Sequence, residues 1–211
     1  MINRKTITII LTLANLCLLV IFVSGWTRPF QNKKTIIRRL TLSKEPVDIS
    51  FKLKGQPVNA SESVRADEGV RAEEFEGDSD WIKELTLKLR NTSGKPITYI
   101  QLNLHFPEVT RDGRTALQQI FLGVDPERKF SRTELRLAPN ESIEIPLSEE
   151  YDNIRSLVET TGKVSLGNIT KLWVEFHAAL FDDGTLFEAG TWYRRNPDQN
   201  DSRKWIKIDN P

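Results

Sequence analysis

Apolar and polar side chains alternate along most of the chain from Val47 onward, which is the pattern of strands with one face on a core. The alternation predicts strands at residues 47–53, 85–89, 100–106, 117–124 and 172–180. Residues 36–42 form a candidate first strand, and residues 135–147 are expected to form two short strands around a Pro-Asn turn. Short strands separated by polar turns are typical of a β-sandwich.

Two turn signals predict how these strands pair. The cluster NTSGKP at 91–96 lies between the strands 85–89 and 100–106, so it predicts an antiparallel hairpin. Residues 182–184 (DDG) predict a second hairpin, because Asp-Gly tolerates the positive φ angles that tight turns require. Its second strand is expected at 186–194. Its first strand is expected to place five apolar side chains on one face: Leu172, Val174, Phe176, Ala178 and Leu180.

One short helix is expected after residue 147. Ile154, Leu157 and Val158 have helical spacing, and Gly162 is a suitable C-terminal stop. Ser148 is the candidate N-cap, followed by acidic residues that favour the first turn of a helix.

Two segments lack a clear pattern. Residues 61–80 (SESVRADEGVRAEEFEGDSD) are rich in charge and poor in large apolar groups. Burying such a segment yields too little hydrophobic free energy to offset the entropy of ordering it, so a mobile acidic loop is expected at 60–80. The C-terminal tail is polar apart from Trp205, Ile206 and Ile208, and we expect it to pack partly back onto the sandwich.

Three segments resemble a known architecture. LKLRNTSGKPITYIQLNLHF (87–106) and LAPNES (137–142) resemble segments of immunoglobulin-like β-sandwich modules in exported bacterial proteins, with Asn140 in place of the usual glycine. FDDGTLFEAGTWYRRNP (181–197) resembles the end of uncharacterised exported bacterial proteins. The expected fold class is mainly β, an antiparallel immunoglobulin-like β-sandwich with one short helix, preceded by an N-terminal hydrophobic helix. The resemblance supplies no functional residue.

The chain is expected to divide into four parts. These are an N-terminal membrane anchor or signal peptide (1–26), a basic connector (27–45), the β-sandwich domain (46–197) and a C-terminal tail (198–211).

The N-terminal part contains an uncharged apolar run at 7–23, preceded by Arg4 and Lys5. Its length lies between that of a membrane-spanning helix and that of a signal-peptide core, so a retained anchor and a cleaved signal both stay open. The retained anchor is favoured, and Trp26 suits the membrane interface. The side chains expected to face lipid are Ile7, Ile10, Leu13, Leu16, Leu19 and Phe22.

The flanking charges bear on topology. Five basic residues follow the apolar run, and by the positive-inside rule they favour a cytoplasmic domain: Arg28, Lys33, Lys34, Arg38 and Arg39. An export signal followed by a β-rich domain favours translocation instead. We expect a cell-envelope protein, with an exported domain on a single-pass inner-membrane anchor, or a periplasmic or secreted protein if the segment is cleaved.

The composition narrows the class of protein. A net charge of +1 over 211 residues argues against a nucleic-acid binder. Cys17 is the only cysteine, so the exported part forms no internal disulfide, which fits a bacterial envelope better than a eukaryotic secretory route. We therefore interpret five Asn-x-Ser/Thr sequons as turn residues rather than glycosylation sites: Asn59, Asn91, Asn140, Asn168 and Asn200.

The sequence shows no catalytic constellation, and neither an enzyme activity nor a cofactor is expected. Glu175 and His177 lie on one strand face and form the only candidate metal pair, without a visible third ligand. A metal-dependent envelope hydrolase that uses this pair is the alternative hypothesis. The acidic stretch 73–80 does not follow the spacing of a calcium loop, so no metal site is predicted.

The candidate binding residues lie near the C-terminus. Rings and guanidinium groups together are enriched at binding surfaces, and five residues supply them: Trp192, Tyr193, Arg194, Arg195 and Trp205. The competing interpretation is that both tryptophans close the end of the core. The leading functional hypothesis is a binding or envelope-assembly module whose partner is an envelope protein or a glycan, besides the membrane at the N-terminal segment.

Overall fold

The structure is a computed structural model that describes residues 33–39, 45–58, 63–65, 70–124, 134–198 and 204–209. The segment Lys33–Pro211 forms one compact unit. The predicted N-terminal helix and its six lipid-facing residues lie outside the described residues. Within the described ranges, no helix is long and apolar enough to cross a membrane.

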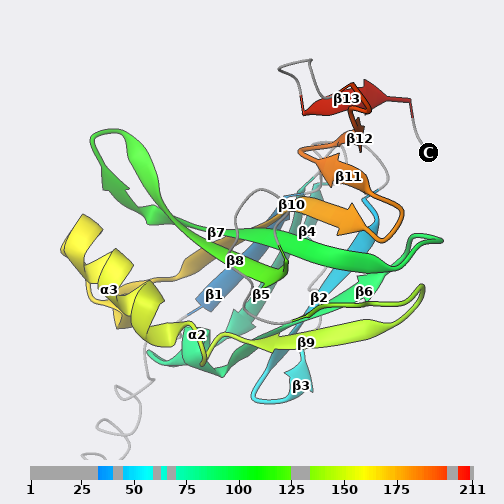
Figure 1. The fold of residues 1–211 in the computed structure, drawn as a ribbon. Coiled ribbons are helices and arrows are strands. Elements are labelled where there is room, and N and C mark those ends of the chain that lie inside the picture. The colour runs from blue at the N-terminus through cyan, green and yellow to red at the C-terminus, as the bar shows by residue number, and fades with distance from the viewer. Residues whose placement is uncertain are drawn as a thin grey trace, which may run out of the picture. The chain divides into compact units, whose positions relative to one another are not determined.

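The fold is mainly β and contains two sheets (Figure 1). Sheet A has nine strands: β1 (Lys33–Arg39), β4 (Ser63–Arg65), β5 (Val70–Glu76), β7 (Ile97–Arg111), β8 (Arg114–Gly123), β10 (Lys171–Phe181), β11 (Thr185–Glu188), β12 (Thr191–Arg195) and β13 (Trp205–Ile208). Sheet B has four strands: β2 (Val47–Leu53), β3 (Gln56–Pro57), β6 (Leu85–Asn91) and β9 (Ser142–Pro146).

The two sheets share one hydrophobic core. Sheet B contributes residues such as Phe51 and Leu87, and sheet A contributes residues such as Leu102 and Val174, all at most 3% exposed. Within the described ranges, three helical segments accompany the sheets: α2 (Trp81–Glu84), α3 (Tyr151–Gly162) and the 3-10 helix η2 (Leu166–Asn168). The buried side of α3 closes one end of this core through Tyr151, Ile154 and Val158.

Sheet A is mixed rather than antiparallel throughout. β1 pairs in parallel with the first half of β10, while the second half of the same edge pairs antiparallel with β11. The opposite edge of β10 pairs with β7. The expectation of an entirely antiparallel fold is therefore wrong at β1, because the alternation of side chains does not specify the direction of a strand's neighbour.

The predicted hairpin at 85–106 is also wrong. β6 pairs with β2 and β9 in sheet B, whereas β7 pairs with β8 and β10 in sheet A. Both strands turn their apolar faces to the same core from opposite sides. The chain therefore crosses between the sheets at residues 92–96 instead of forming a ladder.

Asn91 stabilises this crossing with a fully buried side chain. Its Nδ2 donates to the carbonyl oxygens of Lys95 (2.8 Å) and Leu137 (2.9 Å). Its Oδ1 accepts hydrogen bonds from the backbone N–H (2.9 Å) and the hydroxyl (2.6 Å) of Ser93. A glycan would be attached to this same Nδ2, so the Asn91 sequon is not a glycosylation site in the folded protein.

Replacing Asn91 by alanine is expected to lower the free energy of unfolding by about 1–3 kcal/mol, because the fully buried side chain and its four hydrogen bonds are lost. Urea unfolding followed by circular dichroism measures this change. Asn153→Ala is the matched control, because Asn153 is exposed on α3 and bonds only to Glu150 there. A loss below about 0.5 kcal/mol, the range of ordinary surface substitutions, would contradict the role of Asn91.

The second predicted hairpin forms around residues 182–184, with two differences. A bulge between Phe176 and Ala178 shifts the register with β7, so the core face continues as Ala179 and Phe181. Ala178 and Leu180 belong to a separate cluster on the other face, so the expectation of five apolar residues on one face is wrong after Phe176. The returning strand is also interrupted, because positive φ angles at Ala189 and Gly190 turn β11 into β12.

Asp183 stabilises the turn between β10 and β11. Its carboxylate accepts hydrogen bonds from Thr185 and pairs with Lys95 at 2.7 Å. Burial opposes ionisation, but the bonds from Lys95 and Thr185 outweigh it and lower the pKa of Asp183 to about 2. A lowered pKa stabilises the folded state above the unfolded-state pKa, and this contribution is lost as pH falls to about 2.

Asp183→Asn is therefore expected to lower the melting temperature at pH 6, with the difference from the unchanged protein disappearing between about pH 4 and pH 2. Thermal unfolding across this pH range tests it. Asp182→Asn is the control, because its contact with Arg136 is 3.4 Å long and lies at the surface. A deficit that persists at pH 2 would mean that the charge of Asp183 is not responsible.

The loop expected at 60–80 contains strands β4 and β5. β5 pairs with β1 along its whole length, from Lys33 opposite Glu76 to Arg39 opposite Val70. Glu73 of β5 is only 4% exposed, and this burial raises its pKa against the opposing effect of two arginines. Backbone pairing with a distant strand supplies the order that the composition of the segment does not indicate.

The predicted helix is confirmed as α3. It begins at Tyr151 with Glu150 at the N-cap position, instead of directly after the predicted N-cap Ser148. Lys163 follows the helix in the left-handed conformation. The expectation that the tail packs back is confirmed by β13, which pairs with β12. Residues 47–53 form a strand with the expected bounds.

Candidate functional site

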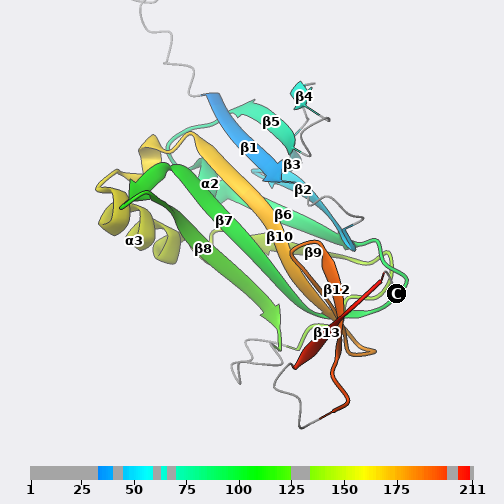
Figure 2. The same cartoon turned by 90° about the horizontal axis from the view of Figure 1, so that it is seen from above.

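The candidate site lies on the face of sheet A that points away from the core. β1, β10, β7 and β8 lie side by side there (Figure 2). Among the described elements, β11, β12 and β13 rise at the end of this face that is distant from α3 (Figure 1). We call the outward side chains at the other end, on these four strands, the open face.

An apolar row crosses the open face. Ile37 lies opposite Trp173, Trp173 opposite His105, and His105 opposite Leu117. Trp173 is 37% exposed and Leu117 is 39% exposed, two of the three large apolar side chains most exposed in the described residues. A ring this exposed in the middle of a sheet offers a flat apolar surface to a ligand.

A polar row lies beside the apolar row, two residues away from it on each of the strands β10, β7 and β8. Glu175 lies opposite Asn103, and Asn103 lies opposite Gln119. The Nε2 atom of His105 lies 3.0 Å from Oε2 of Glu175, which also accepts a hydrogen bond from Asn103 at 3.4 Å. Gln119 donates to Oδ1 of Asn103 at 3.5 Å. The network links side chains of three neighbouring strands across the sheet.

Glu175 is the only acidic member of this network. Burial opposes its ionisation, but the hydrogen bonds from His105 and Asn103, together with the charges of both histidines, outweigh that effect and lower the pKa of Glu175. The side chain is 23% exposed. In the described residues it uses Oε2 for its hydrogen bonds, and its Oε1 has no partner there.

Glu175 and His177, the candidate metal pair of the sequence analysis, have different hydrogen-bonding or ionic partners in the structure. Glu175 bonds to His105 of β7, whereas His177 lies 3.7 Å from Glu188 of β11. In the part of the chain that the structure describes, no group of three or more His, Cys, Asp or Glu side chains is placed to hold a metal ion.

The five candidate binding residues are divided between two faces of β12 and β13. Trp192 packs on the main core, with its ring 5.2 Å from Phe181 and 5.2 Å from Phe187. Tyr193 and Trp205 contact a second apolar cluster on the opposite face, built around Tyr99, Ala178 and Leu186. The candidate site of the sequence analysis is therefore not one continuous surface.

The two arginines of that candidate site are exposed. Arg194 alternates with Tyr193 along β12, and Arg195 lies opposite Trp205 in the pairing with β13. Arg195 and Trp205 thus share the face of the second cluster, which continues the open face at its far end.

Sequence reasoning missed the central ring of the open face. The alternation along β10 places Trp173 with Glu175 and His177, but it assigns no neighbours from other strands. A large aromatic residue at an outward position of an otherwise ordinary strand is the signal that was available. The partners from β7 and β8 depend on a register that no local pattern determines.

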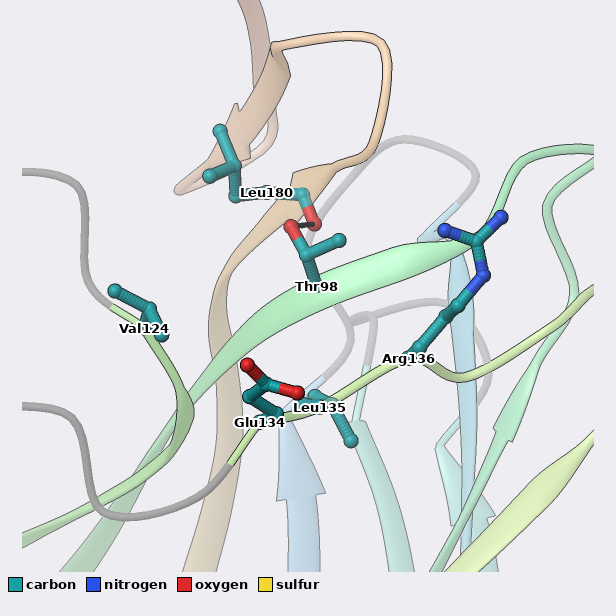
Figure 3. Close-up of a pocket in the computed structure, with 6 residues that line it drawn as sticks. All are labelled: Thr98, Val124, Glu134, Leu135, Arg136 and Leu180. Atoms are coloured by element: carbon teal, nitrogen blue, oxygen red, sulfur yellow. Dashed lines mark hydrogen bonds between the residues drawn. The ribbon is translucent and has the colours of Figure 1, made fainter.

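The structure also contains a cavity of about 440 Å³ at the end of β8, lined by Thr98, Val124, Glu134, Leu135, Arg136 and Leu180 (Figure 3). Thr98 donates a hydrogen bond to the carbonyl oxygen of Leu180 at 3.2 Å. The Arg136 side chain is directed away from Glu134 and contacts Asp182. Since its charged side chains do not converge, we assign the cavity no function.

Comparisons with known proteins were made at three levels. No family model, no curated protein and no solved structure matches the chain.

Proposed function

We propose that the chain is an exported, membrane-tethered binding module of a bacterial cell envelope, and that it binds an extended envelope ligand through the open face. The observation that carries this proposal is the exposed ring of Trp173 beside the ordered network of His105, Glu175 and Asn103. A rigid sheet that presents both a flat apolar surface and oriented polar atoms is suited to recognition.

The uncharged apolar run at 7–23 supports export, and the structure of the basic connector removes an argument against it. Lys34 and Arg38 were counted as basic residues that favour a cytoplasmic domain, yet both are buried, at 1% and 6% exposure. Folding therefore gives a reason for their presence that does not involve the membrane. The immunoglobulin-like arrangement is part of the same proposal, and the two sheets with a shared core support it.

The shape of the open face favours a large ligand over a small substrate. Small molecules bind in concave sites that bury most of their surface. The open face consists of the outward side chains of four paired strands. Its polar groups bond to one another instead of converging on one reacting atom. Binding is therefore the function that this geometry supports, rather than chemical conversion.

Protease accessibility tests the location. The chain is expressed in a diderm bacterial host, and digestion is compared in intact cells, outer-membrane-permeabilised cells and lysed spheroplasts. Digestion that begins when the outer membrane is opened, with residues 7–23 retained by mass spectrometry, is the expected result. Protection until the inner membrane is broken would place the domain in the cytoplasm and overturn the proposal.

Co-sedimentation with isolated envelope material tests the binding face. We expect the purified protein in detergent to pellet with insoluble cell wall, and the His105→Ala/Trp173→Ala variant to stay in the supernatant. The matched control is Lys52→Ala/Lys88→Ala on sheet B, which has an unrelated surface. Equal pelleting of all three proteins would exclude the open face as the binding surface.

A further inference from the structure

We infer that the ligand of the open face is a neutral saccharide chain, stacked on Trp173 and hydrogen-bonded by Glu175, His105 and Gln119. The inference rests on the proposed function, because it names the class of ligand for the same surface.

The apolar row supplies the stacking surface. One face of a pyranose ring carries mainly C–H groups, and these pack on an aromatic plane while the hydroxyl groups stay at the edge of the sugar. Trp173 is 37% exposed, and Ile37 and His105 lie opposite it on the two neighbouring strands. The indole ring is therefore accessible to a ligand between these two strands.

The polar row supplies the hydrogen bonds. Two residues along a strand span about 7 Å, so the polar row lies within reach of hydroxyl groups on a sugar that sits over Trp173. In the described residues, Oε1 of Glu175 and Nδ1 of His105 make no hydrogen bond, so both are available to a ligand. Gln119 donates a hydrogen bond from its Nε2 to Asn103, and its side-chain oxygen Oε1 stays available as an acceptor.

The available atoms match the chemistry of hydroxyl groups. A sugar hydroxyl both donates and accepts, and the polar row offers carboxylate and amide oxygens that only accept, besides an imidazole nitrogen. Fixed side chains lose little conformational entropy when such a ligand binds, which adds to affinity.

The charge of the surface favours a neutral saccharide over an anionic one. Glu175 lies at the centre of the two rows, and its hydrogen bonds from His105 and Asn103 keep it in the carboxylate form. A carboxylate or phosphate on the ligand would be repelled by Glu175, whereas a neutral hydroxyl group would donate to it. Arg39 of β1 lies opposite Glu175 in the register, so the comparison with an anionic polymer decides between neutral and acidic saccharides.

A protein partner would use the open face differently. A protein partner would bury the exposed Leu117 together with Trp173, so truncating Leu117, which is 39% exposed, would also weaken its binding. A sugar stacks on a ring, and a leucine in the same row does not replace that ring. The pair Trp173→Ala and Leu117→Ala therefore separates the two kinds of ligand.

The test is affinity electrophoresis and titration calorimetry of the full chain in detergent, with a panel of soluble neutral polysaccharides: β-glucan, mannan, xylan and galactan. Polygalacturonate serves as the anionic comparison. We expect at least one neutral polymer to bind, Trp173→Ala to weaken it about tenfold or more, equivalent to about 1.4 kcal/mol, and Leu117→Ala to leave it unchanged. Trp173→Phe is expected to retain part of the affinity, because it keeps a ring. Equal melting temperatures of the variants show that folding is intact.

Three results would overturn the inference: no binding to any neutral polymer, binding that Trp173→Ala leaves unchanged, or tighter binding to polygalacturonate than to every neutral polymer. If no neutral polymer binds but the protein still pellets with envelope material, and this pelleting depends on Trp173, the saccharide assignment is wrong and the proposed function stands. If pelleting is also independent of Trp173, the proposed function fails with it.

Discussion

Replacing Arg38 by methionine is expected to lower the free energy of unfolding by about 3–5 kcal/mol, the range for breaking a buried ion pair from one side. Arg38 lies in β1 of sheet A and is 6% exposed. Its Nη1 donates to Asp48 (2.9 Å) and to the carbonyl oxygen of Ile49 (3.1 Å). Its Nη2 donates to Glu45 (3.1 Å) and to the carbonyl oxygen of Val47 (3.2 Å).

Three of these bonds join β1 to β2 of sheet B, and the fourth reaches Glu45 just before β2. β3 pairs only with the last residues of β2, Lys52 and Leu53, so the carbonyl oxygens at the start of β2 are reached by Arg38 instead of by strand β3. Methionine fills similar space but donates no hydrogen bond, and it withdraws the cation from Glu45, whose side chain is 6% exposed. The loss therefore combines unsatisfied backbone acceptors with a buried carboxylate that has lost this partner.

Urea unfolding of the purified protein measures the effect, and Arg90→Met is the matched control. Arg90 contacts the same Asp48 at 3.5 Å, but its side chain is 55% exposed. A surface ion pair of this kind contributes at most about 1 kcal/mol. Arg38→Lys is expected to fall between the two, since lysine keeps the charge and lacks the planar fork of donors. If Arg38→Met and Arg90→Met destabilise equally, Arg38 does not join the sheets.

Arg38 also illustrates where the sequence was insufficient. In the chain it stands in a basic run beside an apolar segment, and the expected role of such a run is solvation near a membrane. Its buried role depends on Val47 and Ile49, which accept its bonds although their side chains belong to the core. Backbone acceptors have no sequence signature, so this contact could not be predicted.

The strands and turns could be predicted from the sequence more readily than their arrangement in the sheets. Alternation is a local property, and it located the strand Val47–Leu53 and the Asp-Gly turn after β10. Which sheet a strand joins is not local. β6 and β7 each have one apolar face, and this pattern fits a hairpin and a crossing between sheets equally well.

The same limit applies to the candidate site. The sequence places Trp173 and Glu175 on one face, and the structure confirms that alternation. His105 reaches Glu175 from a strand 70 positions earlier in the chain. Only the register between β7 and β10 brings the two together, and a bulge in that register shifts the residues after Phe176.

Trp81→Ala is expected to lower the free energy of unfolding by about 3–5 kcal/mol, the range for removing a large buried aromatic side chain. Trp81 begins α2 and is fully buried, with its ring 5.4 Å from Phe75 in an edge-on arrangement. Its Nε1 donates to the carbonyl oxygen of Ile169 at 3.0 Å. The variant loses the buried area, the aromatic pair and this hydrogen bond together.

A double-mutant cycle separates the hydrogen bond from the packing. The Nζ atom of Lys34 donates to the same carbonyl oxygen of Ile169 at 3.0 Å, so either donor alone keeps that acceptor bonded. Trp81→Phe and Lys34→Met each remove one donor and retain most of the side-chain volume. The double variant leaves the carbonyl without either donor, and we expect it to lose about 1 kcal/mol more than the sum of the single variants.

Unfolding by urea at one pH gives all three free energies. Trp173→Phe is the matched control for the aromatic change, because Trp173 is exposed and is expected to cost less than about 0.5 kcal/mol. Strict additivity in the cycle would show that Lys34 and Trp81 do not share the acceptor in solution. A positive coupling would instead show that Lys34, only 1% exposed, stabilises the fold through this carbonyl at the point where β1 meets the start of β10.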